Sequence, residues 1–331
     1  MLVTAAEIEK CFHCQGRRYA EGGRLFFNPS GASIKGLFRG SLLTITLLAE
    51  PIEKGRNAYI RLSLDGRMRR IRLPAKEKSL KFSVREGEHS FEIIKLTESQ
   101  NNFLGISRVE TDGEFLPVRE KKSLKIEFIG DSITTGFGVL SHERYGDYQT
   151  AEQDVTKAFP HLVASALNAE YHLVAAGGWG ICRSKYSEHS IPDFYGNVDL
   201  LRNTDKWDKK RFSPDLFVVT LGTNDFSYLA DLSEEERLRE RTEVKAHFIA
   251  FLEELLREKK PIILLYGFFD YPDLGVMTEE VWREISSPLL STLEVRSASS
   301  LDDIRAGHPG RRTHRLAARR LLRCIRSVLL R

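Results

Sequence analysis

Cysteine is scarce in this chain of 331 residues, which has only four. Disulfide scaffolds are short and dense in cysteine, so a fold held together by disulfides is excluded. Runs of 18 apolar residues are also missing, and no segment is expected to insert into a membrane. The first residues include Glu7 and Glu9 and lack the apolar stretch of a signal peptide. We therefore expect a cytoplasmic protein, or a secreted one if a leader sequence has been trimmed.

A strong excess of charge of one sign is missing as well. Lysine and arginine number 50 and the acids 46, which leaves a net charge of +4. A nucleic-acid partner would need a concentrated basic face, and this small excess does not predict one. One local excess exists, because eight arginines lie between residues 311 and 331. They could meet an acidic partner or an anionic membrane surface, but the solvated face of a terminal helix is the simpler interpretation.

A metal site is not expected either. Cys11, His13 and Cys14 have the close spacing of metal ligands. Zinc, however, needs four ligands, and the chain has no second pair of this kind. We interpret Cys11 and Cys14 as free thiols, and we expect the protein to use no metal and no other cofactor.

The composition is that of an ordinary globular protein, with 41% hydrophobic and 29% charged residues. The chain is longer than one typical domain, and its pattern changes near residue 120. Before that point, short runs of alternating apolar residues recur about every ten residues, which is typical of a β-sandwich. The runs cover residues 41–49, 58–66, 69–74 and 80–97.

After residue 120, apolar strands alternate with helices. Strands are expected at residues 124–130, 170–178, 213–222 and 261–268, and helices at 158–168, 233–260 and 311–330. The run at 213–222 is almost wholly apolar, as in a strand buried on both faces of a parallel sheet. The alternation predicts an α/β domain with the sheet between layers of helices. The expected domains are therefore residues 1–120 and 121–331.

The loop after the first of these strands contains a serine. Ligands of α/β sheets bind at the carboxyl ends of the strands, and Ser132 in Gly-Asp-Ser-Ile would present its hydroxyl and amide there. The lipase-type G-x-S-x-G turn is absent, because Thr134 stands in place of its last glycine. Ser132 also fits a helix cap, and this loop alone does not decide between the two roles.

Two further strand-ending loops carry candidate residues. Gly178 lies in Gly-Gly-Trp-Gly, where a backbone amide can approach a ligand closely, although a plain tight turn is the alternative. Asn224 lies in Gly-Thr-Asn-Asp, where its side chain could instead hold the turn. His308, just before the last helix, is the candidate base, and His314 inside that helix is expected to be structural.

Together these segments resemble the SGNH, or GDSL-type, hydrolase superfamily. The resemblance rests on four blocks in the family's order: Gly-Asp-Ser-Ile at 130–133, Gly178, Gly-Thr-Asn-Asp at 222–225 and His-Pro at 308–309. The preceding β domain, with GRRYAEGGRLFFNPSGASIKGLFRGSLLTITL and GEHSFEIIKLTES, makes the chain similar to carbohydrate esterase family 2. The implied fold is a jelly-roll-like β-sandwich, associated with carbohydrate, followed by a three-layer α/β/α SGNH domain with a parallel sheet.

The resemblance also implies an activity and the residues that carry it. The protein would be a serine esterase that removes O-acetyl groups from oligosaccharides or polysaccharides, such as xylan fragments, through an acyl-enzyme. Ser132 would be the nucleophile and His308 the base. The amides of Ser132 and Gly178 and the side chain of Asn224 would hold the oxyanion. Trp179 would stack on a sugar ring, with ordinary loop packing as the alternative.

The chain departs from the superfamily pattern just before the histidine. The family has an acid two or three residues earlier, where this chain has Ala306 and Arg305. We expect a Ser–His dyad oriented by a backbone carbonyl, with Asp303 as the possible third member if the site has a triad. Two other functions stay open. One is a lipase or thioesterase on short acyl esters, although the sequence shows no long apolar loop to line an acyl tunnel, and the other is a sugar-binding protein without activity.

Overall fold

The computed structural model describes residues 1–118, 122, 124–296 and 302–330, except for the side chain of Asp303. The chain divides into two compact units. The first comprises Met1–Lys121, Gln149–Ala151 and Val198–Trp207, and the second comprises Lys122–Tyr148, Glu152–Asn197 and Asp208–Arg331. Two short segments that come after residue 120 thus belong to the first unit. A single boundary near residue 120 does not predict this.

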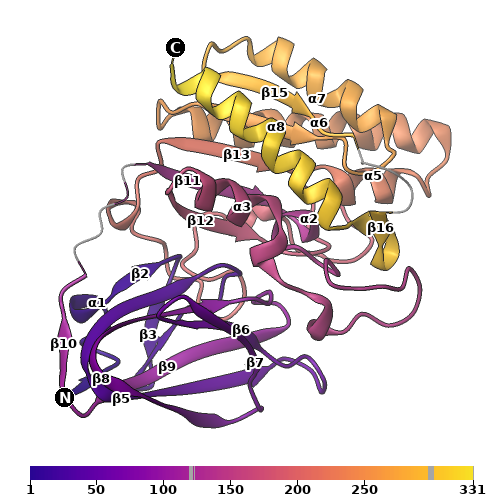
Figure 1. Ribbon diagram of the computed structural model, residues 1–331. Coiled ribbons are helices and arrows are strands. Elements are labelled where there is room, and N and C mark those ends of the chain that lie inside the picture. The colour runs from indigo at the N-terminus through magenta and orange to yellow at the C-terminus, as the bar shows by residue number, and fades with distance from the viewer. Residues whose placement is uncertain (119–121, 123, 297–301, 331) are drawn as a thin grey trace. The chain divides into compact units, whose positions relative to one another are not determined.

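The first unit is an antiparallel sheet, with ten strands among the described residues (Figure 1). Seven of them follow the order β3-β4-β9-β5-β8-β6-β7, and β1, β2 and β10 pair with β9 or β5. The strands are β1 (Leu2–Thr4), β2 (His13–Gln15), β3 (Tyr19–Glu21), β4 (Arg24–Phe26), β5 (Ser33–Pro51), β6 (Tyr59–Leu64), β7 (Arg67–Arg72), β8 (Glu77–Lys95), β9 (Asn102–Thr111) and β10 (Glu114–Leu116), with helix α1 (Ile8–Cys11) between β1 and β2. The four expected runs lie in β5, β6, β7 and β8, so the all-β first domain is confirmed.

Strands β5 and β8 are much longer than the sequence pattern predicts, because each continues for 19 residues. They pair with each other almost throughout, with a register shift between Gly40 and Leu42. Before the shift β5 also pairs with β2 and β10, and after it with β9. One pair of strands thus supplies both halves of the sandwich, around a core that includes Phe38 and Phe91.

The second unit contains a parallel sheet, whose five described strands follow the order β12-β11-β13-β14-β15. They are β11 (Lys125–Gly130), β12 (Glu170–Ala175), β13 (Leu216–Thr220), β14 (Ile262–Tyr266) and β15 (Leu290–Glu294). Each neighbouring pair is parallel, and every residue of β13 is buried. The expected parallel α/β sheet is therefore confirmed. Strand β15 was not expected, since its sequence LSTLE lacks a continuous apolar run.

Helices pack around this sheet in two groups (Figure 1). In one, α3 (Phe159–Ala166) packs on α8 (Arg311–Leu329), and in the other α5 (Thr223–Leu229), α6 (Glu234–Leu256) and α7 (Pro272–Ile285) pack together. Helix α6 begins with a capping box, in which Ser233 and Glu236 each bond the backbone of the other. The shorter elements are α2 (Ser132–Thr135), α4 (Ile191–Phe194), 3₁₀ turns at 150–152, 155–157, 209–211 and 305–307, and the paired strands β16 (Asp303–Ile304) and β17 (His308–Pro309).

The strand order determines where a ligand can bind. Strand β11 lies between β12 and β13, so the chain passes from β11 to its neighbour on one side, β12, and then crosses to its neighbour on the other side, β13. In open α/β sheets a crevice forms at the carboxyl ends of the strands at this point. Ser132 follows β11, Gly178 follows β12 and Asn224 follows β13. The three candidate loops therefore meet at one edge of the sheet.

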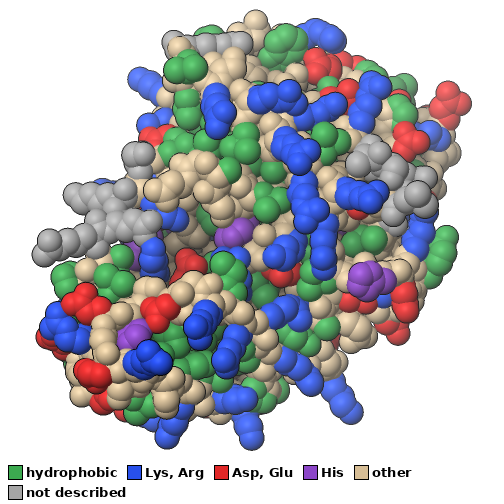
Figure 2. Space-filling model, in the orientation of Figure 1, with side chains coloured by type: hydrophobic (Ala, Val, Ile, Leu, Met, Phe, Trp, Pro, Cys, Tyr) green, Lys and Arg blue, Asp and Glu red, His purple; other side chains and the backbone are tan. Residues whose placement is uncertain are grey.

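The terminal helix has two different faces. Ala317, Leu321 and Ile325 lie on the buried face of α8. On the other face, Figure 2 shows lysine and arginine side chains in a row over this helix. No described helix of the protein is long and apolar enough to cross a membrane. Neither Cys11 nor Cys14 forms a disulfide, and the described residues contain no group of three or more His, Cys, Asp or Glu arranged to hold a metal ion.

Candidate active site

Ser132 is the first residue of α2, which a single residue, Asp131, separates from the end of β11. Asp131 caps this short helix, because its Oδ1 accepts the N–H of Ile133 at 2.9 Å. Only glycine fits at position 130, since a Cβ there would lie 2.0 Å from Oγ1 of Thr134. The hydroxyl of Ser132 is therefore not used by the turn, and its interpretation as a helix cap is wrong.

His308 lies in β17, immediately before α8. Its Nε2 is 2.8 Å from Oγ of Ser132, although 176 residues separate the two in the chain. A serine hydroxyl bonded to an imidazole nitrogen is the arrangement that activates serine as a nucleophile. The structure thus brings the proposed nucleophile and the proposed base into contact.

The other ring nitrogen of His308 faces a backbone carbonyl. Its Nδ1 lies 3.0 Å from the carbonyl oxygen of Arg305. A carbonyl can only accept, so Nδ1 carries the proton and Nε2 is left to accept the hydroxyl of Ser132. Two residues in left-handed conformation, Ala306 with φ of 54° and Gly307 with φ of 77°, turn the chain so that this contact forms.

Asp302 does not serve His308. Its carboxylate accepts the backbone N–H of Thr313 at 2.6 Å and that of Arg312 at 3.3 Å, at the start of α8. It therefore caps the terminal helix. The side chain of Asp303, the possible third member of a triad, lies outside the described residues.

His308 is half-buried between two aromatic rings. The ring centroid of Phe137 lies 4.5 Å from that of His308, and the centroid of Phe269 lies 5.2 Å from it. Burial lowers the pKa of His308 to about 4, because the imidazolium would lose its hydration there, and the carbonyl of Arg305 opposes this effect. The imidazole is therefore neutral at pH 7, as a base must be.

The amides near Ser132 are available to a ligand. Gly178 has φ of +78°, and its carbonyl accepts the hydroxyl of Ser184 at 2.5 Å. Within the described residues, neither the amide of Gly178 nor that of Ser132 donates to another protein group. Two unused N–H groups at the carboxyl edge of the sheet can receive a negatively charged oxygen.

Asn224 is buried at the start of α5. Its Nδ2 donates to the carbonyl of Trp179 at 2.9 Å and approaches Oδ2 of Asp131 at 3.4 Å. The second distance is long for an N–H···O hydrogen bond. One amide hydrogen of Asn224 is therefore held firmly, and the other is held only weakly.

Asp225 is a residue near the candidate site whose role the sequence interpretation missed. It is fully buried, and its carboxylate accepts the backbone N–H groups of Ile181, Cys182 and Arg183 at 2.8, 3.0 and 2.8 Å. Burial raises its pKa against the effect of these bonds. Asp225 thus holds the loop that follows Gly178. Its place in Gly-Thr-Asn-Asp was the available signal, but its partners lie far away in the sequence.

Trp179 is not placed to bind a sugar. Its side chain is only 3% exposed, and its ring packs against His189 and Phe194 at centroid distances of 5.0 and 5.1 Å. A ring so buried has no free face for stacking. The prediction of a sugar contact at Trp179 is therefore wrong, and the alternative of loop packing is right.

A pocket of about 690 Å³ opens beside His308. The pocket is lined by Gly307, which directly precedes His308, and by Phe269, whose ring contacts the ring of His308. Tyr271 also lines the pocket, with its ring nearly parallel to that of Phe269 at 6.2 Å. The charged side chains around it are Arg144, Asp270, Glu294 and Arg296. Aromatic faces next to polar groups suit a ligand that has both kinds of surface.

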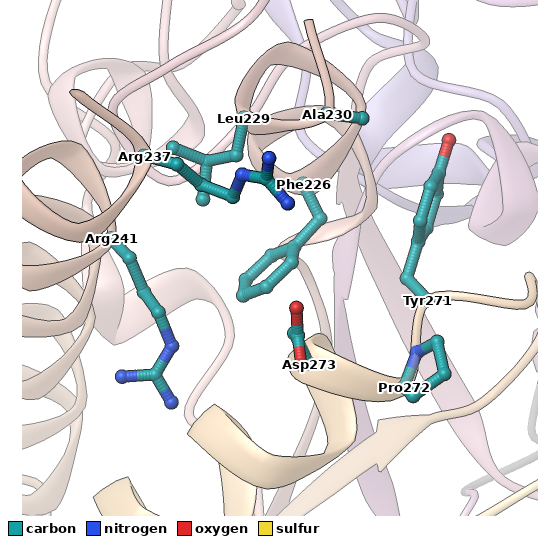
Figure 3. Close-up of a pocket in the computed structure, with 8 residues that line it drawn as sticks. All are labelled: Phe226, Leu229, Ala230, Arg237, Arg241, Tyr271, Pro272 and Asp273. Carbon is teal, nitrogen blue, oxygen red and sulfur yellow. The ribbon is translucent and has the colours of Figure 1, made fainter. Parts of the chain in front are cut away.

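A smaller pocket of about 100 Å³ lies among α5, α6 and the start of α7 (Figure 3). In Figure 3 the ring of Phe226 lies between Arg237 and Arg241 of α6 and Asp273 of α7. Its lining contains no serine, cysteine or histidine, so it offers no nucleophile with a base. The pair of Ser132 and His308 is the better candidate for an active site.

His314, the other histidine of this region, is buried inside α8 and accepts the N–H of Phe159 at its Nδ1 at 3.3 Å. Burial lowers its pKa to about 4 as well. The ring also lies nearly parallel to that of Phe159, with centroids 6.2 Å apart. It therefore joins α8 to α3, which is a structural role.

Two family models match the chain. Residues 128–285 match the GDSL-like Lipase/Acylhydrolase family, and residues 14–118 match the Carbohydrate esterase 2 N-terminal family. An acetylxylan esterase / glucomannan deacetylase of Cellvibrio japonicus (strain Ueda107) is 30% identical over 233 residues. The aligned part covers 68% of this chain and 64% of the relative, so the chain spans less than two thirds of that protein's length.

Solved structures share the architecture over the whole chain. A family two carbohydrate esterase from Cellvibrio japonicus has a TM-score of 0.86 and 25% identity, and the match covers 99% of this chain and 97% of that one. An acetyl xylan esterase from the rumen bacterium Butyrivibrio proteoclasticus has a TM-score of 0.88 and 23% identity, with 99% of each chain covered. The second likeness is one of fold. Together they confirm the expected two-unit architecture.

Proposed function

Since the chain belongs to the GDSL-like hydrolases and has the N-terminal domain of carbohydrate esterase family 2, we propose that it is a serine esterase that removes O-acetyl groups from carbohydrate. The observation that carries this proposal is the 2.8 Å contact between Oγ of Ser132 and Nε2 of His308. The activity named for the Cellvibrio relative supports it.

The reaction begins when Oγ of Ser132 attacks the acetyl carbonyl carbon and Nε2 of His308 takes the hydroxyl proton. The carbonyl oxygen becomes negatively charged, and the amides of Ser132 and Gly178 and Nδ2 of Asn224 donate hydrogen bonds to it. The weakly held hydrogen of Asn224 is the one that turns to this oxygen. The bond to the sugar oxygen then breaks, and His308 returns the proton to that oxygen.

The acetyl group now remains on Ser132 as an ester. A water molecule attacks its carbonyl carbon while His308 takes a proton from the water. The bond to Oγ breaks, acetate leaves, and Ser132 regains its proton from His308. No step needs a cofactor, because proton transfer and charge stabilisation come from the side chains and amides described above.

The sugar occupies the pocket beside His308. Phe269 and Tyr271 offer aromatic surface, and sugar rings have apolar faces that pack on such rings. The carbohydrate is an acetylated xylo-oligosaccharide or a related oligosaccharide or polysaccharide. The β-sandwich is proposed to be associated with carbohydrate as well, and the cytoplasmic location expected from the sequence remains a prediction.

Ser132→Ala tests the proposal. Turnover of an aryl acetate should be abolished while the melting temperature stays close to that of the parent, because among the described residues the hydroxyl bonds only His308 and contributes little to the core. Ser165→Ala, an exposed serine of α3, is the control and should keep full activity. If Ser132→Ala kept its turnover, the nucleophile would be a different group.

Substrate comparisons separate the proposal from its rivals. Acetate release from a panel of acetylated oligosaccharides identifies the sugar. A deacetylase prefers acetate to octanoate esters, whereas a lipase shows the opposite preference. A protein that binds acetylated sugar but releases no acetate would be a binding protein, and the proposed activity would then be rejected.

A further inference from the structure

The side chain of Arg305 is almost completely buried, with 4% of its surface exposed. Its guanidinium makes two parallel hydrogen bonds to Glu152: Nε to Oε2 at 2.8 Å and Nη2 to Oε1 at 2.6 Å. Nη1 donates to the carbonyl of Tyr145, and Glu143 lies 3.6 Å from Nη2. Bidentate pairs of this kind fix the orientation of both side chains, unlike single surface ion pairs.

The loop that follows α2 is shaped around this arginine. A Cβ at Gly138 would lie 2.6 Å from Cβ of Arg305, and a Cβ at Gly146 would lie 3.3 Å from its Nη1. The carbonyl of Arg144 accepts the N–H of Ala306 at 2.8 Å. The loop therefore holds the side chain of Arg305 and also the peptide unit directly after it.

That peptide unit carries the carbonyl that accepts Nδ1–H of His308. The turn to the histidine contains Ala306 in a left-handed conformation, which is unfavourable for a residue with a side chain. Strands β16 and β17 on either side have only two residues each. The paired side chain of Arg305 and the bond from the N–H of Ala306 to Arg144 attach this turn to the loop that follows α2.

We propose that the ion pair between Arg305 and Glu152 is a positioning device for His308. By fixing the carbonyl of Arg305, the pair keeps the proton on Nδ1 and directs Nε2 at Ser132. Neither residue touches the substrate. The inference rests on the proposed esterase function and deepens it, because the pair performs here the orienting task of a triad acid.

Kinetics of four variants of the full chain test this inference. Arg305→Met should lower kcat for an aryl acetate by about 10²-fold, the loss expected when a catalytic group is displaced by about 1 Å, with KM changed by less than threefold. Glu152→Gln should lower kcat in the same direction but less. Arg305→Lys should recover part of the loss. The double variant Arg305→Met/Glu152→Gln should be no slower than Arg305→Met, because both changes remove one interaction.

Arg241 provides a matched control in the same unit. It donates to Glu280 at 3.0 Å and is also partly buried. However, Arg241 lies on α6 and its partner Glu280 lies on α7. Arg241→Met should lower the melting temperature and leave kcat of the folded protein unchanged. An equal loss of kcat in Arg241→Met would show that the effect is general destabilisation and would overturn the inference.

Nitrogen NMR of histidine-labelled protein gives a readout that does not depend on turnover. In the parent, His308 should be the neutral tautomer with the proton on Nδ1, and in Arg305→Met both tautomers should be populated. A single unchanged tautomer, a kcat within twofold of the parent, or a rise in KM alone would each refute the positioning role. If the parent had no esterase activity, the proposed function would fail, and the tautomer would still decide the role of Arg305.

The test does not depend on one variant. Should Arg305→Met fail to fold, Glu152→Gln decides the question, because the side chain of Glu152 reaches the surface with 18% of its area exposed. A folded Glu152→Gln protein with the parent's kcat and the parent's tautomer would refute the inference.

Discussion

The acid limb of the pH–activity profile should lie near pH 4. The pH dependence of kcat/KM reports the titration of the base in the free enzyme, and His308 must be neutral to accept the proton of Ser132. Burial between Phe137 and Phe269 lowers the pKa of His308 to about 4, whereas a histidine in water titrates near 6.5. At pH 5 the buried histidine is about 90% neutral and a hydrated one about 3%, so kcat/KM differs about 30-fold between the two cases.

Phe137→Ala is the perturbation that tests this cause. The ring of Phe137 lies 4.5 Å from that of His308 and stacks on Tyr148 at 4.0 Å. Its removal admits water to the imidazole, and the pKa of His308 should rise toward 6.5. Activity at pH 5 should then fall by up to about 30-fold, while activity at pH 8 changes little. The assay is kcat/KM for an aryl acetate from pH 3.5 to 8, with Tyr59→Ala in the first unit as the control.

Stability should depend on pH in the same direction. The pKa values of His308 and His314 are both lowered to about 4, and the unfolded chain titrates near 6.5. As the pH falls from 6.5 toward 4, the unfolded chain binds these protons first, so the stabilisation present above pH 6.5 is lost. The melting temperature of the Ser132→Ala protein, measured across this pH range, tests the expected loss of stability.

The activity profile gives the result that would refute the reasoning. This result is an acid limb of the parent near pH 6.5, or an acid limb that Phe137→Ala leaves in place.

Three further predictions concern the neighbouring residues. Asn224→Ala should lower kcat by about 10²–10³-fold with little change in KM, the usual loss of an oxyanion donor, and a rise in KM alone would instead indicate binding of the ground state. Asp302→Ala should destabilise the protein by about 1 kcal/mol through loss of the cap of α8, with kcat of the folded protein within a few-fold, and a loss of kcat near 10⁴-fold would reveal a triad acid. Asp225→Ala should free the amides of residues 181–183 and lower kcat about tenfold or more. If Asp225→Ala kept the kcat of the parent, the loop at residues 181–183 would hold its shape without the bonds from Asp225.

The α/β half of the fold was predictable because its strands are buried on both faces. A run such as LFVVT in β13 has four consecutive apolar residues before Thr220, so its sequence marks it as a central strand. The polar residues that follow such strands stand out for the same reason. Ser132, Gly178 and Asn224 could therefore be placed at one edge of the sheet before any coordinates were known, although their catalytic roles remain proposals.

The β-sandwich was only partly predictable. The pattern indicated short strands, but β5 and β8 continue through Gly40 and Gly87 as single strands. Glycine inside an apolar run usually predicts the end of a strand. In β5 and β8, Gly40 and Gly87 instead lie at a register shift within continuous strands. Strand β9 was missed because Gly105 interrupts its apolar pattern. A Cβ at that position would lie 3.1 Å from the ring of Phe26, and this contact comes from another strand.

Other features depend on contacts that the sequence does not reveal. Arg305 and Glu152 are 153 residues apart, and nothing in either segment marks the other as its partner. Trp179 illustrates the opposite error. Its position beside Gly178 favoured a sugar contact, but a loop tryptophan can as well be buried, and the rings of His189 and Phe194 that cover it come from the following segment.

Because Ser132 and His308 are far apart in the chain, the return of turnover during refolding reports when the last part of the site forms. His308 enters the site only when β17 is in place and α8 packs on α3. Contacts between residues so distant in the chain form slowly. After dilution from denaturant, esterase activity should therefore return later than the circular dichroism of the sheet. The site therefore stays incomplete in any part of the chain that ends before His308, even when the strands that carry Ser132, Gly178 and Asn224 are all present.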